Sequence, residues 1–135
     1  MEELIIEAKD ENLGVVQEFI EKNVSPYADP PEKLIVLQIA VEEIFVNISH
    51  YAYNPQTGPA TIRVEILEDP VAVELTFFDN GIPYDPLAKA DPDVTLDADE
   101  RDIGGLGIFM VKQSMDDVSY EYKDGQNILT IKKLL

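Results

Sequence analysis

Residues 34–51 read LIVLQIAVEEIFVNISHY, and this stretch decides how the chain folds. At about 100° per residue, its aliphatic side chains form the single stripe of a helix that packs on a core: Leu34, Leu37, Val41, Ile44 and Ile48. The solvent-facing side then carries Gln38, Glu42 and Ser49. Asp29 before Pro30-Pro31 favours a helix start at Pro31, because Pro fits the first turn and Asp can cap it. We expect the helix to end near Tyr51, before Asn54-Pro55.

The same helix carries a second set of polar residues. Glu43, Asn47 and His50 fall in one column, which apolar side chains flank. A carboxylate beside a carboxamide can coordinate a cation that prefers oxygen ligands, and it can orient a water or a hydroxyl. Taken alone, the helix is explained better by an ordinary rim, with Glu43 partly solvated and Asn47 bonded to a loop. His50, the only histidine, is expected to pack or hydrogen-bond near the helix end rather than to catalyse.

Strands and a shorter helix surround the long helix in the first part of the chain. Residues 3–8 predict a strand, and Asn12 can cap a helix that runs to about Asn23. Apolar residues alternate with polar ones over 62–66 and again over 71–77, which predicts an antiparallel hairpin.

The last third of the chain begins with a long polar segment that ends at Asp102. Its length favours a functional lid or local disorder. A helix with Ile108, Val111 and Met115 in register follows, and Asp124-Gly125 marks a closing hairpin. We find no repeat and no domain boundary, and so we expect a single domain over residues 1–135.

Asp79-Asn80-Gly81 follows directly on the apolar end of the second hairpin strand. A carboxylate in this position can accept a hydrogen bond from a ligand, while the glycine lets the backbone approach closely. An exocyclic amine such as that of adenine is a fitting donor. A plain turn explains the same three residues, because Asp, Asn and Gly are common in turns.

Gly104-Gly105-Leu106-Gly107 opens the last helix. Free amides and the positive end of a helix can hold phosphates, although a G-G-x-G alone also suits a flexible hinge. The run is neither a P-loop, since no Lys-Ser/Thr follows, nor a dinucleotide fingerprint, since no strand precedes it. Arg101 lies three residues upstream, where it can pair with a neighbouring aspartate or face a phosphate.

The composition excludes several classes of protein. The 135 residues carry 27 Asp+Glu against 10 Lys+Arg, a formal charge of −17, and no cysteine. A nucleic-acid scaffold and an anionic membrane surface both require clustered basic residues, so we expect neither partner. A disulfide framework and a thiolate metal site are excluded. We see no signal peptide and no uninterrupted apolar stretch of the roughly 18 residues that a membrane span requires, and we expect a cytoplasmic location.

The order of these motifs is more specific than any one of them. A helical E-x-x-x-N precedes a strand that ends in D-x-G, then a polar segment, then G-G-x-G at the start of a helix. In this order, from Leu4 to Lys133, the chain resembles the histidine-kinase-like (GHKL) ATPases, and among them the stand-alone anti-sigma-factor serine kinases. The resemblance implies an α+β fold of two layers, in which helices cover one face of a mixed, mostly antiparallel sheet.

The resemblance also implies roles for particular residues in binding ATP or ADP with Mg²⁺. Glu43 matches the general base and Asn47 the magnesium ligand. Asp79 matches the acceptor for the adenine amine, and Gly81 allows its close approach. The phosphates are expected over Gly104, Gly105, Leu106 and Gly107, beneath a lid at residues 85–103 that carries Arg101. Asn127 stands near the position where the family often has a threonine that contacts the nucleotide, so either Asn127 takes the place of that threonine or the contact is absent. The first helix lacks the arginine of sporulation-type members.

These parallels predict a Mg-ATP-dependent protein serine/threonine kinase of a bacterial partner-switching pathway. Glu43 then orients or deprotonates the serine of a STAS-type antagonist, and phosphoryl transfer rests mainly on positioning and charge neutralisation. The expected partners are that antagonist, a sigma factor and a second copy of the chain. The alternative is a non-catalytic, nucleotide-loaded module that sequesters a sigma factor or another partner. A detached histidine-kinase catalytic domain is a third reading, disfavoured because we find no phosphoacceptor helix ahead of the domain.

Overall fold

The computed structural model describes residues 1–88 and 106–135 of the chain. Its elements follow in the order β1 (Glu2–Glu7), η1 (Asp10–Asn12), α1 (Leu13–Val24), η2 (Ser25–Tyr27), α2 (Glu32–Tyr51), β2 (Pro59–Leu67), β3 (Ala72–Asp79), α3 (Leu106–Ser114), β4 (Asp117–Lys123) and β5 (Gln126–Leu134). The α-helices and strands lie within a few residues of the places that the hydrophobic pattern predicts, whereas the short 3₁₀ helices η1 and η2 were not predicted.

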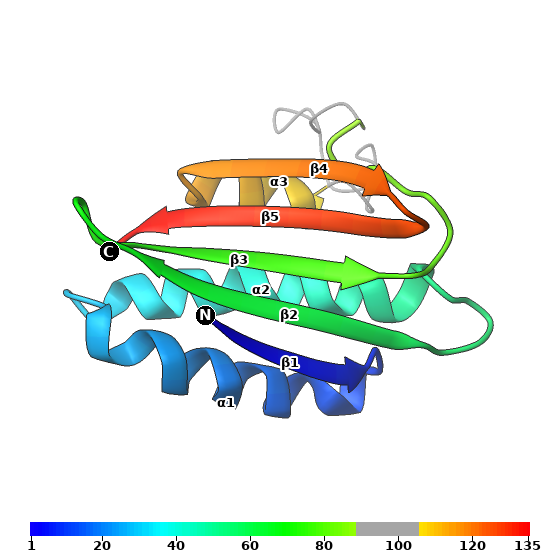
Figure 1. Ribbon diagram of the computed structural model, residues 1–135, viewed down its shortest axis with the longest axis horizontal. Coiled ribbons are helices and arrows are strands. Elements are labelled where there is room, and N and C mark those ends of the chain that lie inside the picture. The colour runs from blue at the N-terminus through cyan, green and yellow to red at the C-terminus, as the bar shows by residue number, and fades with distance from the viewer. Residues whose placement is uncertain (89–105) are drawn as a thin grey trace.

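The five strands form one sheet in the order β1-β2-β3-β5-β4. All four pairings between the described strands are antiparallel, so the expected mixed sheet is purely antiparallel over these residues. Figure 1 shows α2 and α3 behind the sheet, which places the helices in a second layer. The two-layer α+β fold predicted from the sequence is therefore confirmed.

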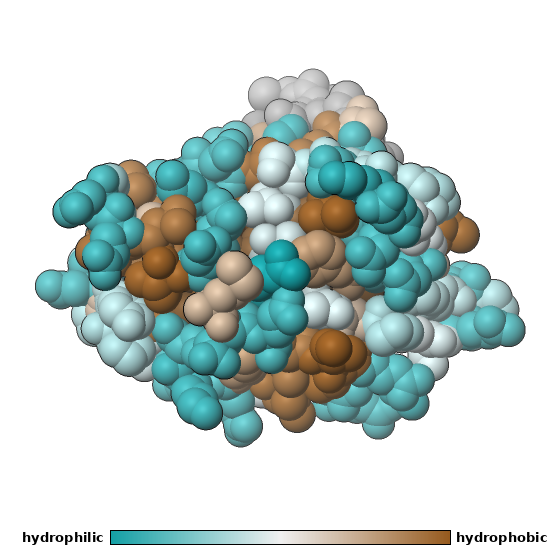
Figure 2. Space-filling view, in the orientation of Figure 1, coloured by the Kyte–Doolittle hydropathy of each residue, from teal (hydrophilic) through white to brown (hydrophobic). Residues whose placement is uncertain are grey.

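The core fills the space between the helices and one face of the sheet. Leu37, Val41 and Ile44 are fully buried, as the stripe on the long helix predicts, and the rings of Phe45 and Phe77 complete the centre. The opposite face of the sheet carries the alternate residues of each strand. It is mostly hydrophilic, with separate apolar patches (Figure 2). One-sided burial of this kind fits an antiparallel sheet with alternating side chains.

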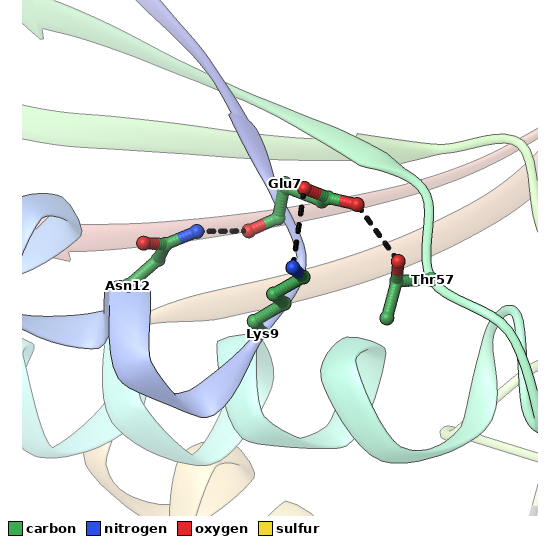
Figure 3. A network of polar contacts seen from close by, with 4 residues as sticks. All are labelled: Glu7, Lys9, Asn12 and Thr57. Carbon is green, nitrogen blue, oxygen red and sulfur yellow. Dashed lines mark hydrogen bonds and ion pairs between the residues drawn. The ribbon is translucent and has the colours of Figure 1, made fainter.

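Three of the predicted polar roles are wrong. The side chain of Asn12 caps no helix, and its Nδ2 donates instead to the carbonyl of Glu7 at 2.9 Å (Figure 3). No side chain caps α2, which begins after Pro31, so Asp29 has no such role. Gln38 is half-buried, because its Nε2 donates to the carbonyl of Gln17 at 2.8 Å across the α1–α2 contact. Asn12 and Gln38 each donate to a backbone carbonyl that helical spacing alone does not predict.

The carboxylate of Glu7 joins the end of β1 to the chain before β2. It accepts a hydrogen bond from Thr57 Oγ1 at 2.7 Å and pairs with Lys9 Nζ at 3.5 Å (Figure 3). These contacts, the Thr57 bond above all, lower the pKa of Glu7 below its usual value. The end of the first strand is thus tied to the loop that leads into the second.

The tight closing hairpin matches the sequence. Asp124 and Gly125 have φ of 53° and 77°, and β4 and β5 continue from them as antiparallel neighbours. Two residues in the left-handed region are what a two-residue hairpin of this type requires.

By length and composition alone, α2 is able to span a membrane. This was not expected from the sequence, because the criterion applied there was an uninterrupted apolar stretch. Core helices of globular domains meet the same test. The apolar residues of α2 that are buried pack within the core described above.

Candidate functional site

Two polar side chains are buried where β3 and β5 lie side by side. Asp79 ends β3 and Asn127 is the second residue of β5. The two are register partners although 48 positions separate them in the chain. Each is only 6% exposed. Asn127 Nδ2 donates to Asp79 Oδ1 at 2.9 Å, and the Gly81 amide donates to the same oxygen at 2.9 Å. Among the described residues, no hydrogen bond reaches the second oxygen, Oδ2.

Asn127 connects three segments of the chain. Besides its bond to Asp79, Nδ2 donates to the carbonyl of Ile82 at 2.8 Å. Its Oδ1 accepts from the Tyr84 amide at 3.1 Å and from the Tyr120 hydroxyl at 2.5 Å. Burial raises the pKa of Tyr120, and the nearby carboxylates of Asp85 and Asp79 raise it further, so the phenol stays protonated as the donor.

A cleft of about 430 Å³ opens beside this pair, between the end of α2 and the sheet. Its apolar walls include Ile44, Ile48, Phe77 and Leu129, and Asp79 is its one carboxylate among the described residues. A flat apolar group with a single hydrogen-bond donor fits such a cleft.

A second cleft, of about 560 Å³, adjoins the first, because Asn47 and Tyr51 line both. Glu43, His50 and Gly107 line the second of these two clefts and not the first. The polar column predicted on α2 is therefore confirmed as one surface. A ligand with an apolar ring and a polar tail can occupy both clefts at once, with the tail near Glu43 and Asn47.

Gly107 lets α3 approach Glu43 closely. A Cβ at this position would overlap Oε2 of Glu43 and would lie 3.1 Å from its carboxyl carbon. Any residue other than glycine would displace the carboxylate, so the position of Glu43 depends on the second residue of α3.

Gly81 faces a similar restriction, because a Cβ there would overlap the carbonyl oxygen of Ala52 at the end of α2. The amide of Ile82 donates to that carbonyl at 3.0 Å. The loop after Asp79 is thus held against α2. The close approach of Gly81 to a ligand stays a prediction.

Tyr53 strengthens this contact, and sequence reasoning missed it. Its hydroxyl donates to the carbonyl of Pro59 at 2.6 Å and accepts from the Asn80 amide at 2.7 Å. Burial raises the pKa of Tyr53. Tyr84 and Tyr120 were missed as well, although the hairpin register at Asp124-Gly125 already places Tyr120 and Asn127 on one face of the sheet.

His50 hydrogen-bonds as expected. Its Nε2 lies 2.7 Å from Asp10 Oδ2, and this bond is the main cause of a lowered Asp10 pKa.

Part of the predicted phosphate site lies outside the described residues: Arg101, Gly104, Gly105 and most of the lid at 85–103. Leu106 begins α3. No group of three or more acidic or histidine side chains in the described ranges could hold a metal unaided. The side-chain oxygens of Glu43 and Asn47 nevertheless suit Mg²⁺, which commonly takes one or two protein oxygens together with phosphates and waters.

Comparison with known proteins agrees with this geometry. The model of the histidine kinase-like ATPase domain matches residues 6–133. The serine/threonine-protein kinase BtrW of Bordetella bronchiseptica is 32% identical over 95 residues, which are 70% of this chain and 66% of that protein. The serine-protein kinase RsbW of Listeria monocytogenes is 34% identical over 101 residues, 71% of this chain and 63% of the relative. The chain thus matches slightly less than two thirds of each relative's length.

Proposed function

The chain belongs to the histidine kinase-like ATPase domain family, and from this we propose that it binds Mg-ATP across the two joined clefts and phosphorylates a serine or threonine of a partner protein. The observation that carries the proposal is Oδ2 of Asp79, which receives no hydrogen bond from residues 1–88 or 106–135, in an apolar cleft that adjoins Glu43 and Asn47. The relatives named serine-protein kinases support the same activity.

In this proposal the adenine ring lies in the apolar cleft and its amino group donates to Asp79. Asn47 would hold Mg²⁺, and the ion when bound would supply neutralisation of the phosphate charge. The phosphates extend toward Gly107 and the glycines before it. Arg101 and the lid at residues 85–103 cover them, and Gly81 keeps the loop close to the base.

Glu43 orients the hydroxyl of the incoming serine and accepts its proton. The serine oxygen then forms a bond to the γ-phosphorus while the bond to the ADP oxygen breaks. A carboxylate serves this role by geometry, because it must lie within hydrogen-bond reach of the hydroxyl. The shared cleft of Glu43, Asn47 and Gly107 provides such a position.

The net charge of −17 shapes how the nucleotide is held. Phosphates meet an acidic protein, so Mg²⁺ and backbone amides supply the attraction that lysine and arginine supply elsewhere. Nucleotide affinity should therefore fall steeply when magnesium is removed. Binding that persists at full strength in EDTA would contradict this part of the proposal.

We propose a STAS-type antagonist as the phosphorylated partner and a sigma factor as a second binding partner, in the bacterial cytoplasm. A homodimer is the proposed form of the kinase. The acidic surface fits partners with a basic docking face.

The test is transfer of labelled γ-phosphate from ATP to a candidate antagonist. Glu43→Gln should abolish most of the labelling. Glu42→Gln, which changes an exposed carboxylate at the next position, is the matched control and should leave it unchanged. Equal labelling by both variants would refute the role of Glu43. Nucleotide binding with no transfer, even by the wild type, would favour the non-catalytic binding module.

A further inference from the structure

We infer that Asn127 is the residue that sets base selection: it fixes Asp79 so that one carboxylate oxygen alone reads the amino group of the purine, and it makes no contact of its own with the base. This inference rests on the proposed nucleotide site and deepens it. It also changes the expectation that Asn127 takes the place of a ligand-contacting threonine.

The hydrogen-bonding capacity of the Asn127 amide is fully used within the protein. A carboxamide offers two N–H donors and two acceptor positions. The donors go to Asp79 Oδ1 and to the carbonyl of Ile82. The acceptor positions receive the Tyr84 amide and the Tyr120 hydroxyl. Nothing remains with which Asn127 could bind a ligand.

The same bonds fix which oxygen of Asp79 faces the cleft. Oδ1 accepts from both the Gly81 amide and Asn127 Nδ2, at 2.9 Å each. Two donors on Oδ1 hold the plane of the carboxylate, so the other oxygen position is the one left for a ligand. Oδ2 is then the one oxygen of Asp79 that can accept a hydrogen bond from a ligand in the apolar cleft.

A single hydrogen-bond acceptor in this position distinguishes purines by the group at carbon 6, which is an amine in adenine and a carbonyl in hypoxanthine and guanine. The amine of adenine donates to Oδ2. The carbonyl of hypoxanthine or guanine would instead place oxygen against oxygen, and leaving a buried polar group unpaired is costly. Ring nitrogen N1 of adenine has no partner on Asn127, and replacing it with C–H should therefore cost little.

The fixed orientation makes the Asp79→Asn variant informative. The new amide must keep its oxygen toward Gly81 and Asn127, since both donate to that position. Its NH₂ therefore points into the cleft and should donate to a 6-carbonyl base. A single isosteric change is expected to reverse the base preference from adenine to hypoxanthine.

The experiment is calorimetric titration of the wild type and Asp79→Asn with Mg²⁺ and three probes: ADP, 1-deaza-ADP and IDP. For the wild type we expect ADP and 1-deaza-ADP to bind within about threefold of each other, and IDP to bind about 100-fold more weakly or worse. For Asp79→Asn we expect IDP to bind more tightly than ADP.

Two results would overturn the inference. A loss of tenfold or more with 1-deaza-ADP would show that N1 is read, and an Asp79→Asn variant that keeps its ADP preference would show that the orientation is not fixed. If that variant fails to fold, the wild-type comparison of ADP with 1-deaza-ADP still decides. If ADP fails to bind the wild type, the proposed function itself is wrong, which is a distinct outcome.

Discussion

Gly107→Ala should separate catalysis from stability. The added methyl group would overlap Glu43 Oε2, the mobile end of a side chain, so the carboxylate has to move by about 1 Å while the fold remains. A misplacement of about 1 Å in a reacting group can cost about 100-fold in rate, or about 2.7 kcal/mol of activation free energy. We therefore expect phosphoryl transfer to fall by about two orders of magnitude.

The free energy of unfolding of Gly107→Ala should not fall together with its rate of phosphoryl transfer. Alanine is favoured over glycine inside a helix by roughly 0.5–1 kcal/mol, which offsets the local crowding. Gly14→Ala is the matched control, because Gly14 is also the second residue of its helix and a Cβ there meets nothing within 4 Å. The assay is labelled transfer together with urea unfolding of both variants.

The reasoning fails if Gly107→Ala transfers phosphate at the wild-type rate. It fails equally if Gly14→Ala loses as much activity, because glycine at the second helical position would then matter for another reason. Unfolding of Gly107→Ala would show that Glu43 cannot yield to the methyl group.

Three further predictions concern the clefts, the core and acid stability. Gly81→Ala places a Cβ against the backbone carbonyl of Ala52, so we expect a loss of about 1–3 kcal/mol in unfolding free energy and a loss of ADP binding; unchanged binding would contradict the close approach. Phe77→Ala removes a fully buried ring and should cost about 3–5 kcal/mol in urea unfolding, whereas less than about 1 kcal/mol would contradict its place in the core. The pKa of Asp10 is lowered in the fold, so the contribution of Asp10 to stability is present above about pH 4 and is lost as the pH falls through the lowered value. We therefore expect Asp10→Asn to flatten the decline of the melting temperature below pH 4. An unchanged slope would contradict the bond to His50.

The sequence predicted the elements well because their signals are local. The stripe on α2 and the alternation in β2 and β3 depend on neighbours a few residues away. Asp124-Gly125 specified its turn for the same reason, since both residues tolerate the left-handed backbone that the hairpin requires.

The polar contacts were predicted less well because they depend on which strands become neighbours. Asp79 and Asn127 meet only because β3 pairs with β5, and no local rule predicts that pairing. Asn12 was expected to cap α1 and bonds the end of β1 instead.

The central claim is that the cleft beside Asp79 binds an adenine nucleotide, and thermal unfolding with and without Mg-ADP tests it most directly. At a ligand concentration 100 times its dissociation constant, binding should stabilise the wild type by about 2.7 kcal/mol, and Asp79→Ala should lose most of that gain. A wild-type melting temperature that nucleotide leaves unchanged, or an equal rise in Asp79→Ala, would contradict the claim.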